Sequence, residues 1–357
     1  EPKRVAETSA SKAPCEPQLT VLKQLWAQEV QSSDGDSEPA DIFCVRHSPD
    51  DTLIAAGCGD GAVRLLQADG GHLAYTLFEA GGSNLPTTCL RFRPAASSSK
   101  TRNILIAGCS DGTVKHWHVT SQKCMHTITE QNNQVYALDY TADAAHFATG
   151  GRDCTVRVYD EATKTCMLSL GSSFDRQAVG HSSRIFAVKF DPNNPACLLS
   201  AGWDNTVQIW DVREGRSVRS IFGAHVCGDS LDLDGGVVLT GSWRPTEQLQ
   251  LWDLSTGALI DAGHVPWGGD QSGREPCQVY GAQFSKGSAR EWIAAGGSGS
   301  NEIKIFSRTS KKAIGMLSLP KGVYGLDFAN NGKTVAIAAG DSKVRVVAVP
   351  DVARKVH

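Results

Sequence analysis

Residues 180–211 read GHSSRIFAVKFDPNNPACLLSAGWDNTVQIWD, and this stretch decides the fold that the whole chain is expected to have. It holds three runs rich in Val, Ile, Phe and Trp, which favour pleated, half-buried positions: Ile185–Phe190, Cys197–Gly202 and Thr206–Trp210. Asp, Asn and Pro fill the gaps between the runs, at 191–194 and 203–205, and these residues favour turns. The stretch therefore predicts three strands joined by two turns.

The ends of the stretch carry a more specific signal. It opens with a Gly-His pair and closes with a Trp-Asp pair, and in this it resembles one repeat of the WD40 family. The resemblance implies a hydrogen-bonded tetrad across the unit, with the matching residues His181, Ser200, Asp204 and Trp210. These residue types suit the role, because a carboxylate can accept from an imidazole and a hydroxyl can accept from an indole N–H.

Similar units recur along the chain. One landmark position in the third strand is found seven times: at Leu66, Trp117, Tyr159, Trp210, Trp252, Phe306 and Val347. The shorter intervals match the WD40 repeat of about 40–45 residues. The longer intervals contain polar insertions near 95–102, 172–183 and 261–276. Seven such units predict an all-β fold, a seven-bladed WD40 β-propeller.

The seventh unit shows only three clear strands, so the ring needs a strand from elsewhere. Leu19–Trp26 is apolar, precedes the first unit and can pair with Lys343–Val349, which would close the ring and cover a sheet edge. The expected organisation is a flexible tail over 1–18, a propeller over 19–349 with its closing strand at 19–26, and a C-terminal tail over 350–357. Because the chain begins with Glu1, we expect a fragment or a processed product.

The composition and motifs of the chain exclude several classes of partner and of site. The net charge is −3, which gives no reason to expect nucleic acid as a direct partner, and no apolar run has the length of a membrane span. The eleven cysteines form no C-x-x-C pair and are expected to be reduced thiols of a cytosolic protein. We find no catalytic constellation, no metal-ligand spacing and no cofactor motif, so a non-enzymatic protein with no cofactor and no metal is expected. The turn carboxylates that recur once per unit, such as Asp60 and Asp111, are interpreted as turn stabilisers.

An aromatic series points to a binding surface. The second residue of the first strand is aromatic in five of the seven units, and in the WD40 family this strand lines the central channel. Trp and Arg residues are expected on the same face, in turns or beside the first strand, and both types are common at interface hot spots. The predicted partner-binding residues at this channel mouth are Phe43, Tyr136, Arg152, Arg184, Phe186, Trp203, Trp243, Arg244, Tyr280 and Tyr324. The alternative for the aromatic series is packing between neighbouring blades, and Trp267 in the 261–276 insertion is a further candidate.

These observations predict a scaffold that holds other proteins or peptide segments within a multi-subunit complex. Among such complexes a ciliary, axonemal or centriolar assembly is preferred on overall character alone. The alternative is a peptide-tail reader or substrate adaptor of the chromatin or ubiquitin-ligase type that uses the channel mouth. A reader of a basic tail would need an acid beside the aromatic rings, and Asp229 is the nearest candidate. The expected localisation is cytoplasmic, with the cytoskeleton or cilium as the finer setting and the nucleus as an open alternative.

Overall fold

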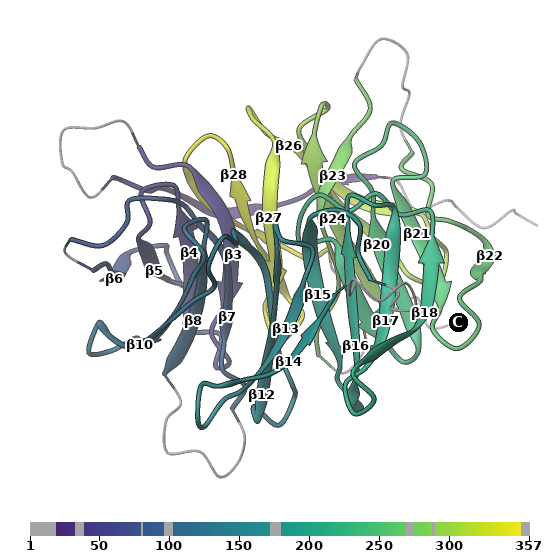
Figure 1. Ribbon diagram of the computed structural model, residues 1–357. Coiled ribbons are helices and arrows are strands. Elements are labelled where there is room, and N and C mark those ends of the chain that lie inside the picture. The colour runs from purple at the N-terminus through teal and green to yellow at the C-terminus, as the bar shows by residue number, and fades with distance from the viewer. Residues whose placement is uncertain are drawn as a thin grey trace, which may run out of the picture.

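Seven β-sheets follow one another in a closed ring in the computed structural model, which describes residues 19–32, 39–79, 81–95, 103–171, 180–268, 275–287 and 290–350. Figure 1 shows these sheets from the side. No helix occurs within these ranges. The fold is thus the predicted seven-bladed β-propeller. The N-terminal tail, 1–18, lies outside the described residues, as do 96–102 of the insertion predicted at 95–102, 172–179 of that at 172–183, 269–274 of that at 261–276, and 351–357 of the tail predicted at 350–357.

Blades 1 to 4 are each a meander of four consecutive antiparallel strands, numbered from the channel outwards. In blades 1 and 2 the strands are β3 (Ile42–His47), β4 (Leu53–Cys58), β5 (Val63–Gln67), β6 (Leu73–Leu77), β7 (Thr87–Phe92), β8 (Ile104–Cys109), β9 (Thr113–His118) and β10 (Lys123–Thr129). In blades 3 and 4 they are β11 (Val135–Tyr140), β12 (His146–Gly151), β13 (Val156–Asp160), β14 (Cys166–Leu170), β15 (Ile185–Asp191), β16 (Asn194–Gly202), β17 (Thr206–Asp211) and β18 (Arg216–Phe222).

Blades 5 to 7 follow the same plan, except that the last blade supplies only three strands from its own unit. Their strands are β19 (Leu231–Asp234), β20 (Val237–Gly241), β21 (Leu249–Asp253), β22 (Leu259–His264), β23 (Gln278–Phe284), β24 (Trp292–Ser298), β25 (Glu302–Ser307), β26 (Ala313–Ser318), β27 (Val323–Phe328), β28 (Thr334–Ala339) and β29 (Lys343–Ala348).

The ring is closed by the N-terminal segment, as predicted, but the closing strand lies later than 19–26. It is β2 (Gln24–Glu29), which pairs antiparallel with β29 as the outermost strand of blade 7. The start of the predicted strand instead forms β1 (Thr20–Val21), a short parallel addition to β26 in blade 6. Leu22 is buried between the two short strands, so one apolar run in the sequence serves two neighbouring blades.

The core lies between adjacent blades, because each sheet buries Val, Ile and Leu side chains against the sheet that follows it. One cluster joins blades 7 and 1 and includes Val30 and Ile42, while another joins blades 4 and 5 and includes Leu199 and Trp252. The predicted tetrad lies inside blade 4. The His181 ring is 2.7 Å from Asp204 Oδ2 through Nδ1 and 2.7 Å from Ser200 Oγ through Nε2, and Trp210 Nε1 donates to the same hydroxyl at 2.7 Å.

Polar bonds also connect the innermost strands around the channel. Positions in the innermost strands are counted from the residue that corresponds to Ile42 of β3, which is Gly228 in blade 5 and Val279 in blade 6. Where the fifth position carries Asp or Gln, its side-chain oxygen accepts the backbone N–H of the sixth position in the next blade. Four such bonds of 2.8–2.9 Å occur: Phe190 N to Asp139, Phe284 N to Asp232, Phe328 N to Gln283 and His47 N to Asp327. The remaining blades carry Arg46, Arg91 and Lys189 at this position.

Candidate functional site

A β-bulge in the innermost strand positions the predicted aromatic side chains. In six blades the pairing register shifts between the first and third residues of this strand, so the second residue has no partner in the ladder. A bulge of this kind re-aims a side chain away from the regular alternation. The first residue, for example Ile42 or Val135, is then fully buried, while the second is only partly buried. The six bulge residues are Phe43, Thr88, Tyr136, Phe186, Tyr280 and Tyr324.

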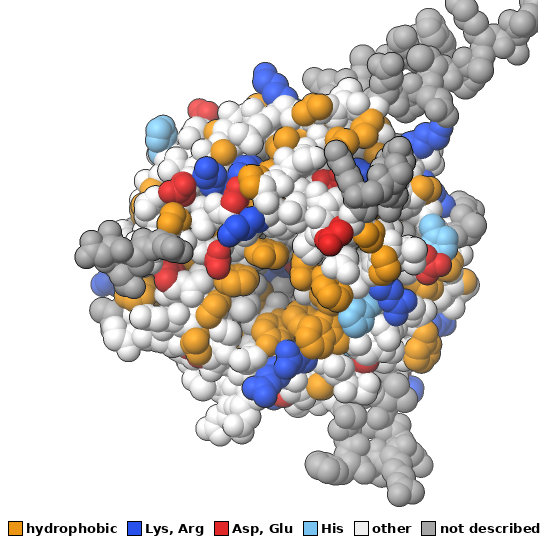
Figure 2. All heavy atoms as spheres, turned by 90° about the horizontal axis from the view of Figure 1, so that it is seen from above, with side chains coloured by type: hydrophobic (Ala, Val, Ile, Leu, Met, Phe, Trp, Pro, Cys, Tyr) orange, Lys and Arg blue, Asp and Glu red, His pale blue; other side chains and the backbone are white. Residues whose placement is uncertain are grey.

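All six bulge residues line one cavity of about 420 Å³ at the channel mouth. On the face of the molecule where the innermost strands begin, hydrophobic side chains gather around a central hollow (Figure 2). The predicted aromatic series, far apart in sequence, thus meets in one concave site.

The rings also contact one another around the mouth. Tyr136 and Phe186 stack with centroids 4.9 Å apart, and Tyr324 lies 5.6 Å from Tyr280 and 6.1 Å from Phe43. These separations are typical of favourable aromatic pairs. Packing against neighbouring rings and exposure to the cavity therefore occur together at the same residues, because each ring contacts at least one other ring and still lines the cavity.

Trp203 and Trp243 extend this lining onto the outer surface. They follow β16 and β20, and each retains more than a third of its surface exposed, 39% for Trp203 and 37% for Trp243. The Trp203 ring is 5.2 Å from Phe186, and the Trp243 ring is 6.5 Å from Tyr280. Both tryptophans therefore adjoin the cavity without lining it. Trp267, by contrast, is buried and its indole N–H is bonded to Glu302, so it belongs to the core.

The three predicted arginines differ in their surroundings. The Arg184 guanidinium lies over the Trp203 ring at 5.0 Å, a cation–π distance. Arg244 donates to Asn205 Oδ1 at 2.9 Å, beside the same tryptophan turn. Arg152 is exposed in the turn after β12, and the contact that the structure gives for it is made by its backbone. The first two flank the aromatic surface directly.

Blade 5 departs from the aromatic pattern. The pairing of Leu231 with Thr240 matches that of Leu138 with Thr149 in blade 3, so Asp229 occupies the position that Tyr136 holds there. The chain approaches this position closely along blade 6, where a Cβ atom at Gly228 would clash with the Tyr280 carbonyl oxygen. Asp229 therefore completes the ring of seven side chains around the mouth.

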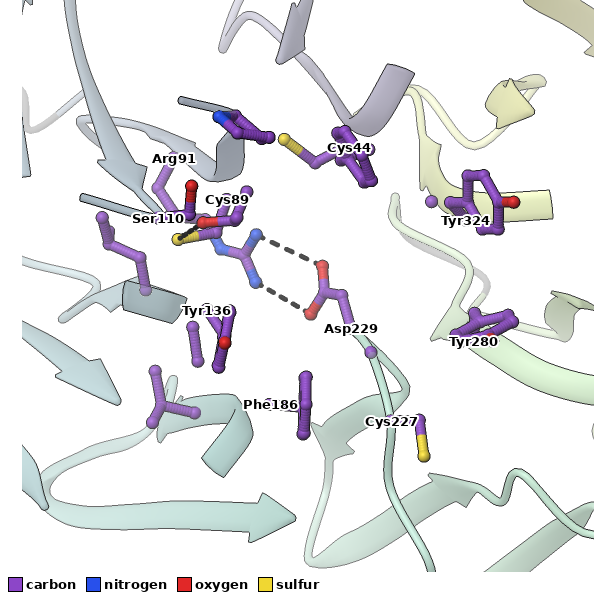
Figure 3. Close-up of a pocket in the computed structure, with 18 of the residues that line it drawn as sticks. Cys44, Cys89, Arg91, Ser110, Tyr136, Phe186, Cys227, Asp229, Tyr280 and Tyr324 are labelled. Atoms are coloured by element: carbon purple, nitrogen blue, oxygen red, sulfur yellow. Dashed lines mark hydrogen bonds and ion pairs between the residues drawn. The ribbon is translucent and has the colours of Figure 1, made fainter. Parts of the chain in front are cut away.

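Asp229 reaches across the channel to two arginines from the fifth positions of blades 1 and 2. Arg91 donates to both carboxylate oxygens, at 3.2 and 3.4 Å (Figure 3). Arg46 forms an ion pair with the same group. Burial and the neighbouring charge of Arg91 lower the pKa of Arg46 to about 10. An anion between the two guanidinium groups offsets their mutual repulsion.

Below the mouth the charges are paired. Lys189 Nζ lies 2.9 Å from Asp232 Oδ1, and Lys286 Nζ lies 2.8 Å from Asp327 Oδ1. Asp327 is fully buried, which alone would raise its pKa, but Lys286, His47 and Arg46 together hold the pKa well below its usual value. The floor is thus a network of charged groups beneath an aromatic rim.

The thiols in the lining are not suited to nucleophilic chemistry. Burial raises the pKa of Cys89 to about 12 and that of Cys227 to about 11, and it raises the pKa of Cys44 further. A thiolate is therefore rare at these positions near neutral pH. The ten cysteines in the described part of the chain are all free of disulfides.

The sequence predicts the aromatic residues around the mouth but not the charged residues beneath them. Arg46 and Arg91 were not predicted, although the charged residue at the fifth position of each first strand was a visible signal. The sequence suggests Asp229 as an acid for a basic ligand, but in the structure its carboxylate is ion-paired with Arg46 and Arg91. Within the described ranges no group of His, Cys, Asp and Glu could hold a metal ion. The same ranges contain no helix that could span a membrane.

Comparisons with known proteins agree with this architecture. The family model "WD domain, G-beta repeat" matches residues 28–66, 82–118, 122–160 and 173–211. The chain is 27% identical over 225 residues to "COMPASS component SWD3" of Saccharomyces cerevisiae, covering 60% of this chain and 68% of that protein. It is 25% identical over 313 residues to "Pre-mRNA-processing factor 19" of Oryza sativa subsp. japonica, covering 85% of this chain and 54% of that protein.

A third relative is much longer than this chain. "Periodic tryptophan protein 2 homolog" of Dictyostelium discoideum is 25% identical over 194 residues, which are 54% of this chain and 20% of that protein. The chain thus spans only a fifth of the length of this relative.

Proposed function

The chain belongs to the WD40-repeat family of β-propellers, and on that premise we propose that it is a non-enzymatic scaffold that holds partner proteins in a larger complex through its channel mouth. The observation that carries the proposal is the cavity of about 420 Å³ lined by five aromatic side chains from five blades. Its rim continues into Trp203 and Trp243, which are exposed. Exposed Trp and Tyr in a concave site are typical of interface hot spots.

The surface fits an extended peptide segment better than a flat protein face. The cavity accepts one or two side chains, while the exposed tryptophans and Arg184 lie outside it and can contact the flanking residues. A segment of a partner would therefore insert one anchor and lie across blades 4 and 5. A role as a substrate adaptor or peptide-tail reader would use the same contact.

The test is capture of partners by purified variants. Tyr136→Ala, Tyr280→Ala and Trp203→Ala should each lose partners from a cell extract, by about ten-fold or more, since truncation of a hot spot costs at least ~2 kcal/mol. Phe222→Ala is the matched control, because Phe222 is an exposed aromatic residue (73%) on the outermost strand of blade 4. Circular dichroism must show that each variant is folded. Folded variants that recover the full set of partners would contradict the proposal.

The cellular setting is a separate part of the proposal. The ciliary or centriolar assembly rests on overall character, whereas one relative carries the word COMPASS in its name and another the words pre-mRNA processing. Imaging of a fluorescent fusion decides between these settings. Signal at cilia or centrioles supports the first, and signal confined to the nucleus contradicts it and the cytoplasmic localisation.

A further inference from the structure

Three charged residues line the mouth cavity, and they contact one another. Arg46 and Arg91 carry two positive charges, and Asp229 carries the one negative charge among the lining residues. Arg91 is also paired with Asp139 at 3.0 Å, and Arg46 lies 4.0 Å from Asp327, so the charges of the channel balance only while a carboxylate occupies the place of Asp229. Another carboxylate can take that place without changing the balance, whereas a cationic ligand would meet two guanidinium groups.

The two guanidinium groups are held in place by strand atoms, independently of Asp229. Arg91 Nε donates to Asp139 Oδ1 at 3.0 Å, and Arg46 Nη1 donates to the carbonyl oxygens of Val45 and Leu326 at 2.8 and 3.1 Å. The Arg46 side chain is only 7% exposed. These bonds would persist if the aspartate withdrew, and they would leave a preformed site for a carboxylate.

Asp229 is less firmly enclosed than the other acids of the channel. Its side chain is 30% exposed, compared with 10% for Asp139 and 0% for Asp327. It lies before β19 rather than within the strand, and its carboxylate accepts no backbone N–H among the bonds that the structure gives. Its backbone carbonyl oxygen accepts the N–H of Ala282 in blade 6, a bond that does not depend on the side chain. The carboxylates of Asp139, Asp232 and Asp327 each accept a backbone N–H. Asp229 is therefore the acid whose removal disturbs the ring least.

We propose that Arg46 and Arg91 form a carboxylate-binding site in which Asp229 is a resident, replaceable ligand. An acidic side chain of a bound peptide would take the place of Asp229 between the two guanidinium groups, and neighbouring apolar residues of the peptide would contact the aromatic rim. The inference rests on the proposed function in taking the mouth as the contact surface. It adds that the anchor is a glutamate or aspartate.

The site itself can be probed with formate. Asp229→Ala deletes one carboxylate from the cavity, and formate is the smallest molecule that can restore it. We expect Asp229→Ala to melt several degrees below the wild-type protein in sodium chloride. Sodium formate at equal ionic strength should recover at least half of the difference, with a saturable dependence on concentration. The wild-type protein should respond little, because its site is occupied.

Two variants control this measurement. Asp211→Ala removes a partly buried aspartate at the end of β17 from its pair with the exposed Arg213, and formate should not rescue it. The double variant Asp229→Ala with Arg91→Gln should also lose the response to formate. If Asp229→Ala responds no more than Asp211→Ala, then the cavity accepts no external carboxylate and the inference is wrong.

A peptide extends the test to the anchor. We would titrate N-acetylated, C-amidated Gly-Phe-Glu-Phe-Gly and the same peptide with Gln in place of Glu, by calorimetry. The Glu peptide should bind Asp229→Ala at least ten-fold more tightly than the wild-type protein, because the competing aspartate is absent. The Gln peptide should show no such gain. Equal affinities of the two peptides for Asp229→Ala would overturn the choice of an acidic anchor.

The outcomes separate this inference from the proposed function. If formate fails to rescue Asp229→Ala while Tyr280→Ala still loses its partners, the mouth binds proteins but Asp229 is only a structural contact. If formate rescues the variant while the aromatic variants keep every partner, the carboxylate site exists but partners bind elsewhere. The second result would contradict the proposed function and retain the anion site.

Discussion

Blades 4 and 5 are neighbours that carry different residues, with different contacts, at corresponding positions. In blade 4 the tetrad is complete, its aspartate lies in a turn, and the second position of the inner strand is aromatic. Blade 5 keeps only the last link, from Trp252 Nε1 to Thr240 Oγ1 at 2.9 Å, and its second position is Asp229. The polar residues of blade 4 bond to one another within the blade, whereas the Asp229 carboxylate of blade 5 pairs with arginines across the channel.

This difference shows that a blade can keep its four strands and its buried core without the complete tetrad. Blade 5 still buries Leu239 and Leu249 completely and shares a core cluster with blade 4. Its stability comes from packing between blades, so its polar positions are available for other contacts. We expect the two blades to respond differently to matched substitutions.

The largest effect should come from opening the ring, on which both blades depend. Deletion of residues 1–30 removes β1 and β2, together with the buried Leu22 and Val30 and the bond from Trp26 Nε1 to Ala68 O. Burial of Leu22 and Val30, together with the partial burial of Trp26, is worth roughly 5 kcal/mol, or a fall in Tm on the order of 10 °C. Deletion of 1–18 is the control and should change little, because that segment has no apolar pattern. Equal melting temperatures for the two deletions would contradict closure by β2.

A smaller effect should separate the two blades directly. Ser200 accepts from Trp210 and is bonded to His181, so Ser200→Ala should leave two buried polar groups unpaired and cost about 2–3 kcal/mol. Thr240→Val in blade 5 removes one such bond and should cost about 1 kcal/mol. Denaturant unfolding measures both. Equal costs would mean that the tetrad adds nothing beyond a single hydrogen bond.

The smallest effect concerns pH. Burial alone would raise the pKa of Asp204, but hydrogen bonds from His181 and Thr206 outweigh it and hold the pKa below its ordinary value. A lowered pKa in the folded state stabilises the protein above the unfolded pKa of about 3.9, and this contribution is lost as the pH falls through the folded pKa. The difference in unfolding free energy between the wild-type protein and Asp204→Asn should therefore shrink below about pH 4.

Blade 5 provides the reference for this dependence, since Arg244 lies in its corresponding turn and no aspartate is present there. The cost of Thr240→Val should stay constant over the same pH range. A parallel decline in both blades would indicate general acid unfolding instead of titration of Asp204.

The fold was predictable because its determinants are local. A short apolar run predicts each strand, and Asp, Asn, Gly or Pro predicts each turn. The repeat of this pattern along the chain predicts the number of blades. The closing strand was displaced by a few residues, since the apolar run at 19–26 does not reveal that Leu22 and Lys23 separate two strands in different blades. Pairing with β29, and not composition, sets its true limits.

The site was predictable only in part. The aromatic series is periodic and could be read from the chain, but its convergence in one cavity depends on six bulges that leave no sign in the sequence. The contact of Asp229 with Arg46 and Arg91 joins blades on opposite sides of the ring. Nothing local distinguishes this carboxylate from a turn aspartate, so only the assembled channel reveals its partners.

The most direct test of the central claim is photo-crosslinking from inside the mouth. Phe43 lines the cavity and Phe222 lies exposed on the outer strand of blade 4, and each can be replaced by p-benzoylphenylalanine with its aromatic ring retained. Irradiation in a cell extract should link partner protein covalently to the chain carrying the probe at Phe43, with little product from Phe222. Abundant product at Phe222 and none at Phe43, from two folded proteins, would place the binding surface on the outer strands of the propeller and contradict the account.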